Sequence, residues 1–312
     1  MRILEYIIPA NRNGVTVGWF LRNDCGLSRR LVTSLKHHPL GITANGKHIR
    51  TVDILNEDDL LAIRMEGSYT AVQPADILLS VLYEDDDIII IDKPANMPMH
   101  PTHGHLTDTL ANAYAAYAGK KGEPTSFRPV GRLDRNTTGI VVACKNSLAA
   151  NALQAKNTGF MPKFQNQIKK TYLAICEGEL YGEGTINAPI RRKEGFGIRR
   201  EIGDGGQSCV THWQSRTIIK SKNGEAKSKA DSGVTLVEIW LETGRTHQIR
   251  THFAEFLKTP LCGDDMYGGH LDRIVRHALH CAKVEFTHPI TGQKLVFRAD
   301  LPEDMAEIVS SE

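Results

Sequence analysis

The sequence predicts an α+β fold with a small α/β unit at its N-terminus, and three patterns indicate it. An unbroken run of branched apolar residues at 88–91 is typical of a strand buried on both faces. Residues 171–177 and 234–241 are expected to be strands, in which successive side chains, such as those of Tyr172 and Leu173, point to opposite faces. Leucines recur every four residues within 27–38, which predicts an amphipathic helix.

The chain divides into three segments. A length of 312 residues gives room for about two domains. Residues 1–66 form the small unit, and residues 67–78, which contain Gly67 and Pro74, are expected to be a linker. Residues 79–312 form the larger α+β domain.

The small unit has a helix followed by a hairpin. Ser28 can cap the start of the helix. Asn45-Gly46 stands between two short apolar segments, as a tight hairpin turn does. The two elements carry basic side chains, so the unit presents a surface able to contact phosphates: Arg29, Arg30 and Lys47.

The turn at 131–139, Gly-Arg-Leu-Asp-Arg-Asn-Thr-Thr-Gly, leads straight into a second apolar strand at 140–143. Asp134 lies between Arg132 and Arg135, and nearby positive charges favour the ionised carboxylate. The turn is either a charged surface turn of ordinary composition or a nucleophile held ionised on a rigid core strand.

The strand at 234–241 is followed by a helix that starts near Thr246. The spacing of its apolar residues predicts a face that packs inward: Ile249, Phe253, Phe256 and Leu257. Arg250 lies beside that face. A buried arginine is costly unless it is paired, so Arg250 needs a carboxylate, and Asp134 is the partner we expect.

Composition excludes several classes of protein. No apolar run approaches the roughly 20 residues that span a bilayer, and no secretory signal is evident, so we expect a cytoplasmic protein without a membrane partner. The net charge of +2 is low for a nucleic-acid binder. Basic residues nevertheless cluster locally, at Lys169-Lys170, at 191–193 and at Arg199-Arg200.

The cysteines and histidines do not predict a metal site. The six cysteines are scattered singly, without the spacing of metal knuckles or redox motifs. Histidines crowd the C-terminal third, but no two stand one helical turn apart with an acid between them. The histidines concerned are His247, His252, His277, His280 and His288. A metal hydrolase that uses them is the weakest of the alternative functions.

Several motifs along residues 80–303 resemble, in the same order, those of the RNA pseudouridine synthase family typified by the ribosomal enzymes RluA and RluD. They are Tyr83-Glu84-Asp85, Asp92-Lys93-Pro94, Met99-His100-Pro101, Arg132-Leu133-Asp134, Lys170-Thr171-Tyr172, Gly244-Arg245-Thr246-His247-Gln248-Ile249-Arg250 and Leu279-His280. The family often has His before Arg-Leu-Asp, where this chain has Gly131. The N-terminal unit resembles the S-four-type RNA-binding module through Ser28-Arg29-Arg30 and Asn45-Gly46-Lys47.

The resemblance implies a mixed, largely antiparallel central sheet with flanking helices and a catalytic cleft. It implies that Asp134 is the nucleophile, Arg250 its ion-pair partner and Tyr172 the aromatic residue against the uracil and a candidate base. Arg132 would fill the space left by the flipped nucleotide. Further motif residues would bind the substrate uridine, namely Leu133, Arg245, His247 and Leu279, and RNA contacts would come from Arg29, Arg30, Lys47, Lys169 and Lys170.

The implied reaction isomerises uridine to pseudouridine in ribosomal RNA or transfer RNA, and it needs neither cofactor nor metal. The carboxylate either attacks the anomeric carbon or assists removal of a sugar proton to give a glycal, and both routes remain open. A monomer is expected. The alternative is a non-catalytic RNA-binding protein with a degenerate synthase fold, which would explain the basic clusters but not the combination of Asp134, Tyr172 and Arg250.

Overall fold

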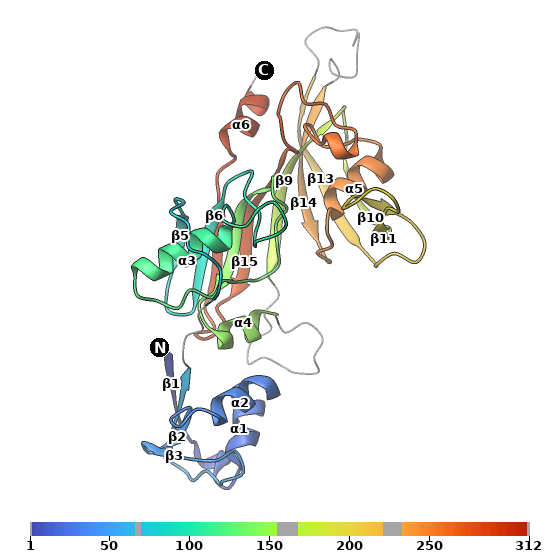
Figure 1. The fold of residues 1–312 in the computed structure, drawn as a ribbon. Coiled ribbons are helices and arrows are strands. Elements are labelled where there is room, and N and C mark those ends of the chain that lie inside the picture. The colour runs from blue at the N-terminus through green and yellow to red at the C-terminus, as the bar shows by residue number, and fades with distance from the viewer. Residues whose placement is uncertain (1, 66–69, 155–167, 221–232, 311–312) are drawn as a thin grey trace.

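The computed structural model describes residues 2–65, 70–154, 168–220 and 233–310. A small N-terminal unit lies at one end of a larger domain built on one long sheet (Figure 1). The predicted α+β class with a mixed, largely antiparallel central sheet is confirmed, because all but one of the strand pairings in that sheet are antiparallel.

The N-terminal unit is a four-stranded sheet, in the order β1-β4-β2-β3, covered by two helices. Ser28 caps the second helix, since its side chain accepts a hydrogen bond from the backbone N–H of Leu31 at 3.2 Å. Asn45 and Gly46 both have positive φ angles, 51° and 76°, as the predicted tight hairpin requires. The elements are β1 (Arg2–Ile7), η1 (Ala10–Arg12), α1 (Val17–Asn23), α2 (Arg29–Lys36), β2 (Ile42–Ala44), β3 (Lys47–His48) and β4 (Leu60–Met65).

The N-terminal unit packs against the larger domain. Leu148, from a helix of that domain, is part of the small unit's apolar core, and Ile290 lies against it. Of the predicted linker, residues 67–69 lie outside the described residues. The remainder bonds to the domain, since Asn112 donates its side-chain amide to the carbonyl of Gln73 at 2.7 Å.

The central sheet runs in the order β10-β13-β14-β9-β15-β8-β6-β5, with β16 beside β15 and β7 beside β8. The branched apolar run at 88–91 is completely buried in β6, as predicted. The strands are β5 (Ser80–Glu84), β6 (Ile88–Lys93), β7 (Arg128–Pro129), β8 (Thr138–Cys144), β9 (Lys169–Glu177), β10 (Glu183–Asn187), β13 (Val210–Ile219), β14 (Val234–Leu241), β15 (Leu279–Thr287) and β16 (Lys294–Arg298).

The remaining elements flank this sheet (Figure 1). No helix within the described ranges is long and apolar enough to cross a bilayer. A separate two-stranded hairpin is formed by β11 (Ile190–Arg192) and β12 (Arg200–Ile202). The helices are α3 (Leu110–Lys120), α4 (Ser147–Gln154), α5 (Gln248–Thr251), the π-helix η3 (His252–Leu257), the 3-10 helix η4 (Asp265–Tyr267) and α6 (Glu303–Ser310).

The helix predicted from Thr246 differs from the expectation in its second half. Ile249 and Phe253 are buried as predicted, but Phe256 is 53% exposed. The reason is the change from α-helix to π-helix at His252. A π-helix has more residues per turn, so Phe256 rotates away from the face that a 3.6-residue period assigns to it, whereas Leu257 is partly buried and still packs against the core.

The one parallel pairing, between β8 and β15, depends on a glycine. Gly139 lies opposite Cys281, its φ is +99°, and a Cβ atom built on it would lie 2.4 Å from the carbonyl oxygen of Cys281. Only glycine permits both this backbone angle and this close approach. The contact therefore fixes the turn at 131–137 against β15.

We predict that Gly139→Ala lowers the free energy of unfolding by on the order of 3 kcal/mol, because strain in φ adds to the clash with Cys281. Urea unfolding followed by circular dichroism measures the change. Gly119→Ala in α3 is the control, since its Cβ meets nothing closer than 4.0 Å and alanine favours helix. Equal stability of the two variants would contradict the close approach.

Candidate active site

A groove of about 2250 Å³ runs from the turn at 131–136 to the helices of the N-terminal unit. Its walls also include parts of β7, α4, the segment before α5 and the loops after β6 and before β15. Of the residues predicted to form the site, those that line the groove are Arg132, Leu133, Asp134, His247 and Arg250.

The turn that carries Asp134 is held by bonds to its backbone and side chains. The buried ammonium of Lys93 donates to the carbonyl of Arg135 at 3.0 Å, and also to two carbonyls of its own loop. Arg276 donates to the carbonyl of Asn136 at 3.2 Å. These bonds satisfy carbonyl groups that would otherwise be stranded under the turn, so the turn is rigid.

The charge of Lys93 is sensitive to its burial. Desolvation lowers the pKa of Lys93 to about 7, and attraction to the Asp134 carboxylate opposes that shift. The three carbonyl contacts of 2.8 to 3.0 Å match the three N–H donors of an ammonium group. Lys93 thus supports the backbone of the turn from beneath, and its three carbonyl partners suit the charged ammonium form.

Arg250 connects two carboxylates. Its Nε and Nη2 donate to the two oxygens of Asp264 at 2.8 and 2.7 Å, and its Nη1 donates to Asp134 at 3.4 Å. The predicted contact between Arg250 and Asp134 is confirmed. The tighter partner is Asp264, whose side chain is 1% exposed, whereas that of Asp134 is 18% exposed and faces the groove.

The electrostatics of this cluster follow from burial and pairing. Burial raises the pKa of Asp264, and the hydrogen bonds from Arg250 oppose that shift. Burial works against the charge of Arg250, yet its bonds to Asp264 and its attraction to both carboxylates raise its pKa. The two short parallel N–H···O bonds are those of an ionised bidentate pair. Arg250 therefore stays positive beside Asp134.

Tyr267 and His247 complete this wall. The guanidinium of Arg250 lies 5.0 Å from the centre of the Tyr267 ring, and the Tyr267 hydroxyl is 3.0 Å from Nδ1 of His247. The Nε2 atom of His247 lies 3.9 Å from Asp134. Burial lowers the pKa of His247 to about 4, so its ring is neutral at neutral pH.

Three predicted site residues lie outside the groove wall in the described part of the chain. Tyr172 is buried in β9 beside Cys281, and Leu279 is buried in the neighbouring strand β15. Burial, together with the neighbouring Cys281 thiol and Asp134 carboxylate, raises the pKa of Tyr172 well above its usual value, so it is a neutral phenol. Arg245 is exposed on the loop before α5.

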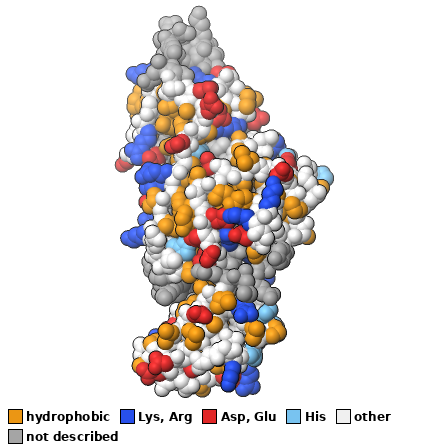
Figure 2. All heavy atoms as spheres, turned by 90° about the vertical axis from the view of Figure 1, so that its left-hand side faces the viewer, with side chains coloured by type: hydrophobic (Ala, Val, Ile, Leu, Met, Phe, Trp, Pro, Cys, Tyr) orange, Lys and Arg blue, Asp and Glu red, His pale blue; other side chains and the backbone are white. Residues whose placement is uncertain are grey.

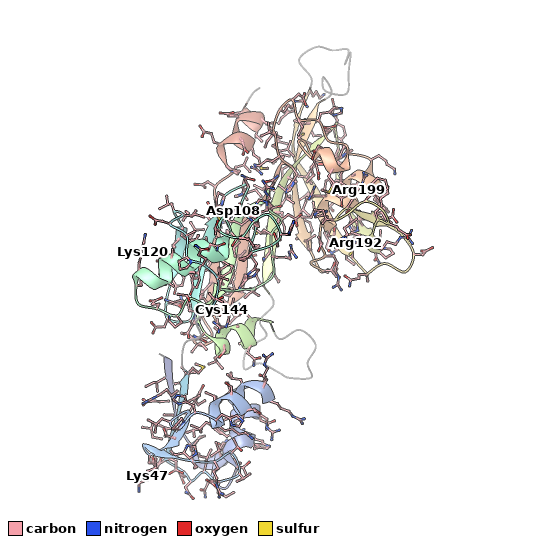
Figure 3. The ribbon with its side chains drawn as sticks, viewed as in Figure 1. Lys47, Asp108, Lys120, Cys144, Arg192 and Arg199 are labelled. Atoms are coloured by element: carbon pink, nitrogen blue, oxygen red, sulfur yellow. The ribbon has the colours of Figure 1, made fainter. Side chains whose placement is uncertain are left out.

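The predicted RNA-contacting residues are spread over the molecule. Arg29 lines the groove, and Arg30 is exposed next to it on α2. Lys47 lies at the far end of the N-terminal unit (Figure 3). Lys169 is exposed at the start of β9, and Lys170 reaches the carbonyl of Val130 at 3.4 Å, next to the turn that carries Asp134.

The C-terminal histidines have separate hydrogen-bond partners, although His247 and His277 both line the groove. Within the described ranges, three ligand atoms close enough to share a metal ion occur at Asp85, Asp87 and His288. Asp85 is already engaged there, by His288 at 3.0 Å and by the backbone N–H of Asp87 at 2.8 Å. The other partners are Tyr267 for His247, Thr211 for His252, Thr137 for His277 and Thr138 for His280.

Comparison with known proteins identifies the family. The sequence pattern that describes the RNA pseudouridylate synthase family matches residues 87–255. The chain is also 36% identical to YhcT of Bacillus subtilis, an RNA pseudouridine synthase by name, over 98% of this chain and 96% of that protein. The chain belongs to the RNA pseudouridine synthase family. It is therefore an isomerase that acts on RNA.

Other relatives agree with this identification. The synthase is 33% identical to the ribosomal large subunit pseudouridine synthase D of Xanthomonas campestris, over 86% of this chain and 80% of that one. Its fold is shared by human RNA pseudouridylate synthase domain containing 1, with a TM-score of 0.56 at 23% identity, covering 72% of this chain and 84% of that one.

The sequence did not indicate two members of the cluster around Arg250. Neither Asp264 nor Tyr267 belongs to a motif that marks it as a partner of Arg250. The one available signal was a carboxylate directly after the apolar pair Leu261-Cys262 and Gly263, where an unpaired charge would be costly. Lys93 and Arg276 bond to the turn at 131–136 from distant parts of the chain, and the sequence of the turn does not reveal these partners.

We predict that Arg250→Ala lowers the free energy of unfolding of the synthase by about 3 to 5 kcal/mol, because it leaves the buried Asp264 carboxylate without its counter-ion. Urea unfolding measures the loss. Arg245→Ala, an exposed arginine five residues earlier, should cost less than about 0.5 kcal/mol. If both variants were equally stable, the buried ion pair would not be a stabilising constraint.

We predict that acid destabilises the synthase in part through His247. Its pKa is about 4 in the folded protein against about 6.5 unfolded, so between these values the unfolded chain binds more protons and stability falls as pH falls. His247→Gln should reduce the slope of unfolding free energy between pH 6.5 and 4 by up to about 1.4 kcal/mol per pH unit. His103→Gln, at an exposed histidine, is the control, and an unchanged slope in His247→Gln would contradict the assignment.

Proposed function

We propose that this synthase converts uridine to pseudouridine in large-subunit ribosomal RNA, with Asp134 as the nucleophile. The observation that carries the proposal is that the Asp134 carboxylate lines the groove while the buried Arg250 guanidinium contacts it. The choice of ribosomal RNA is supported by relatives at 32 to 33% identity whose names specify the large ribosomal subunit.

The residue types suit the chemistry. The bond from ribose C1′ to uracil N1 breaks, the base turns within the pocket, and C1′ bonds to uracil C5, which then loses its proton while N1 gains one. No electrons enter or leave. An ionised carboxylate is needed for attack at C1′ and for proton removal in the glycal route, and the Asp134 carboxylate lies 3.4 Å from the Arg250 guanidinium.

Tyr172 is proposed to pack against the uracil. A base that removes the C5 proton must be basic enough to accept it, and burial keeps Tyr172 a neutral phenol, which is a very weak base. Asp134 is therefore the better candidate for this last proton transfer. Leu279 on the adjacent strand and Leu133 beside Asp134 are proposed to supply apolar surface for the base.

Arg132 is proposed to occupy the space that the flipped nucleotide leaves. It is exposed in the groove, two residues from the nucleophile, on a turn whose backbone is fixed. Extruding a stacked base costs a few kcal/mol, least in loops, so a side chain that replaces the base suits a looped RNA substrate. His247 and Arg245 are proposed to contact the ribose and phosphate near the target.

The N-terminal unit is proposed to bind the same RNA. Arg29 lines the groove that contains Asp134, and Arg30, Lys47, Lys169 and Lys170 are further candidate phosphate contacts. We propose an S-four-type module at 1–66, a linker at 67–78 and a synthase domain at 79–312, acting as a cytoplasmic monomer. Light scattering and cell fractionation test the last two points.

We predict that Asp134→Asn abolishes isomerisation, by more than about a thousandfold, while the protein stays folded, because the amide cannot act as nucleophile or base. The assay is tritium release from ribosomal RNA whose uridines are labelled at carbon 5. Asp265→Asn, an exposed carboxylate of the same groove, should retain activity. Retained release by Asp134→Asn would refute the nucleophile, and no release by the unaltered protein would favour a non-catalytic RNA-binding protein.

The RNA itself is tested in cells. Pseudouridines are mapped in ribosomal and transfer RNA with the gene, without it and with the Asp134→Asn gene. Loss of specific large-subunit sites in the last two strains is expected. Loss confined to transfer RNA would reassign the substrate and leave the chemistry in place.

A further inference from the structure

The hairpin formed by β11 and β12, residues 190–202, is a basic arm beside α5 (Figure 1). It carries five basic side chains against two acidic ones. Arg192 and Arg199 lie on it in Figure 3. By contrast, acidic and basic side chains are interspersed over the face that carries α3, shown in Figure 2. The arm is therefore a local concentration of positive charge in a chain of net charge +2.

The loop of the arm also exposes apolar surface. Phe196 is 57% exposed and Ile198 is 61% exposed. The ammonium of Lys193 lies 4.7 Å from the centre of the Phe196 ring, so an aromatic surface and a cation stand together. Aromatic side chains interleaved with basic ones are typical of surfaces that stack unpaired bases and contact their phosphates.

The arm is joined to the active-site groove. Ile198 and Arg200 line the same groove as Asp134. The backbone N–H of Arg200 donates to the Tyr267 hydroxyl at 2.8 Å, and the Arg199 guanidinium lies 5.2 Å from the centre of the Tyr267 ring. The Nε atom of Arg199 is a buried donor for which no described residue provides an acceptor. The tyrosine that packs on Arg250 thus also anchors the arm.

We propose that the arm binds an unpaired nucleotide next to the target uridine, with the base stacked on Phe196 and Ile198 and the flanking phosphates near Lys193 and Arg199. Two exposed apolar side chains are too few for a stable protein interface, which buries about 800 Å² on each partner. A polyanion with a planar base satisfies both the charge and the apolar surface. The proposal rests on the proposed function, since the groove must hold RNA.

Binding to labelled oligonucleotides tests the stacking. Fluorescence anisotropy compares a 5′-fluorescein oligouridine of about 12 nucleotides with the matching oligo(5,6-dihydrouridine), which has the same phosphates but a non-planar base that cannot stack. Phe196→Ala/Ile198→Ala is expected to weaken binding of oligouridine about tenfold and to leave binding of the dihydrouridine oligomer unchanged. Both side chains are exposed, so the melting temperature should stay the same.

Two further variants separate stacking from charge and from general surface effects. Lys193→Ala should weaken the binding of both oligomers by the same factor and reduce the salt dependence of that binding. Tyr181→Ala removes an aromatic ring that is 62% exposed and lies outside the groove wall. It should leave the binding of both oligomers unchanged. No loss with Phe196→Ala/Ile198→Ala, an equal loss on both oligomers, or an equal loss with Tyr181→Ala would each overturn the proposal.

Kinetics on ribosomal RNA distinguish this proposal from the proposed function. Because Phe196 and Ile198 are proposed to contact a flanking nucleotide and not the target uridine, Phe196→Ala/Ile198→Ala should raise KM about tenfold with kcat within about twofold. A fall in kcat alone would overturn the docking role. If the unaltered protein releases no tritium but still binds oligouridine more tightly than the dihydrouridine oligomer, the proposed stacking on the arm is supported and the proposed function is wrong.

Discussion

The site depends on one buried cation, Arg250. A guanidinium that is 6% exposed must be paired, and Asp264 supplies two hydrogen bonds at 2.7 and 2.8 Å while the Tyr267 ring covers it. That pairing leaves Nη1 to contact Asp134 at 3.4 Å. The groove carboxylate therefore lies beside a positive charge whose position is fixed by another residue, and it remains available for chemistry.

This arrangement constrains the fold around it. The turn that carries Asp134 reaches Arg250 because β8 lies parallel to β15, and that pairing requires Gly139 against Cys281. Arg276 then connects the turn to the C-terminus, since it donates both to the carbonyl of Asn136 and to the carboxylate of Asp304 in α6. Distant segments thus hold one short turn, which limits the motion of a group that must be placed closely for catalysis.

The charges of the groove suit an RNA substrate better than the net charge suggests. Burial lowers the pKa of His247 and of His277, which both line the groove, so their rings are neutral at neutral pH and arginines dominate the local field. The groove also extends to Arg29 on the N-terminal unit and to Arg200 on the arm. Because acidic side chains elsewhere cancel the total, composition alone understates this local positive surface.

Local elements and their types followed from the sequence. The helix capped by Ser28, the Asn45-Gly46 hairpin, the buried run in β6 and the strands β9 and β14 depend on period and turn chemistry that neighbouring residues encode. The ordered motifs gave the family, and the cost of burying Arg250 predicted a carboxylate partner. The expected roles of Tyr172, Arg245 and Leu279 remain predictions. None of these three residues lines the groove.

The tertiary structure alone decided which groups meet. Asp264 is 14 residues from Arg250 and Asp134 is 116 residues away, yet the nearer carboxylate takes the bidentate contact and the distant one faces the groove. The π-helix at 252–257 turned Phe256 outward against the period that the sequence displayed. Residue type and spacing report what a segment needs, such as a counter-ion or a buried face. Which partner satisfies the need is set by the geometry of packed strands and loops, and no local pattern encodes that geometry.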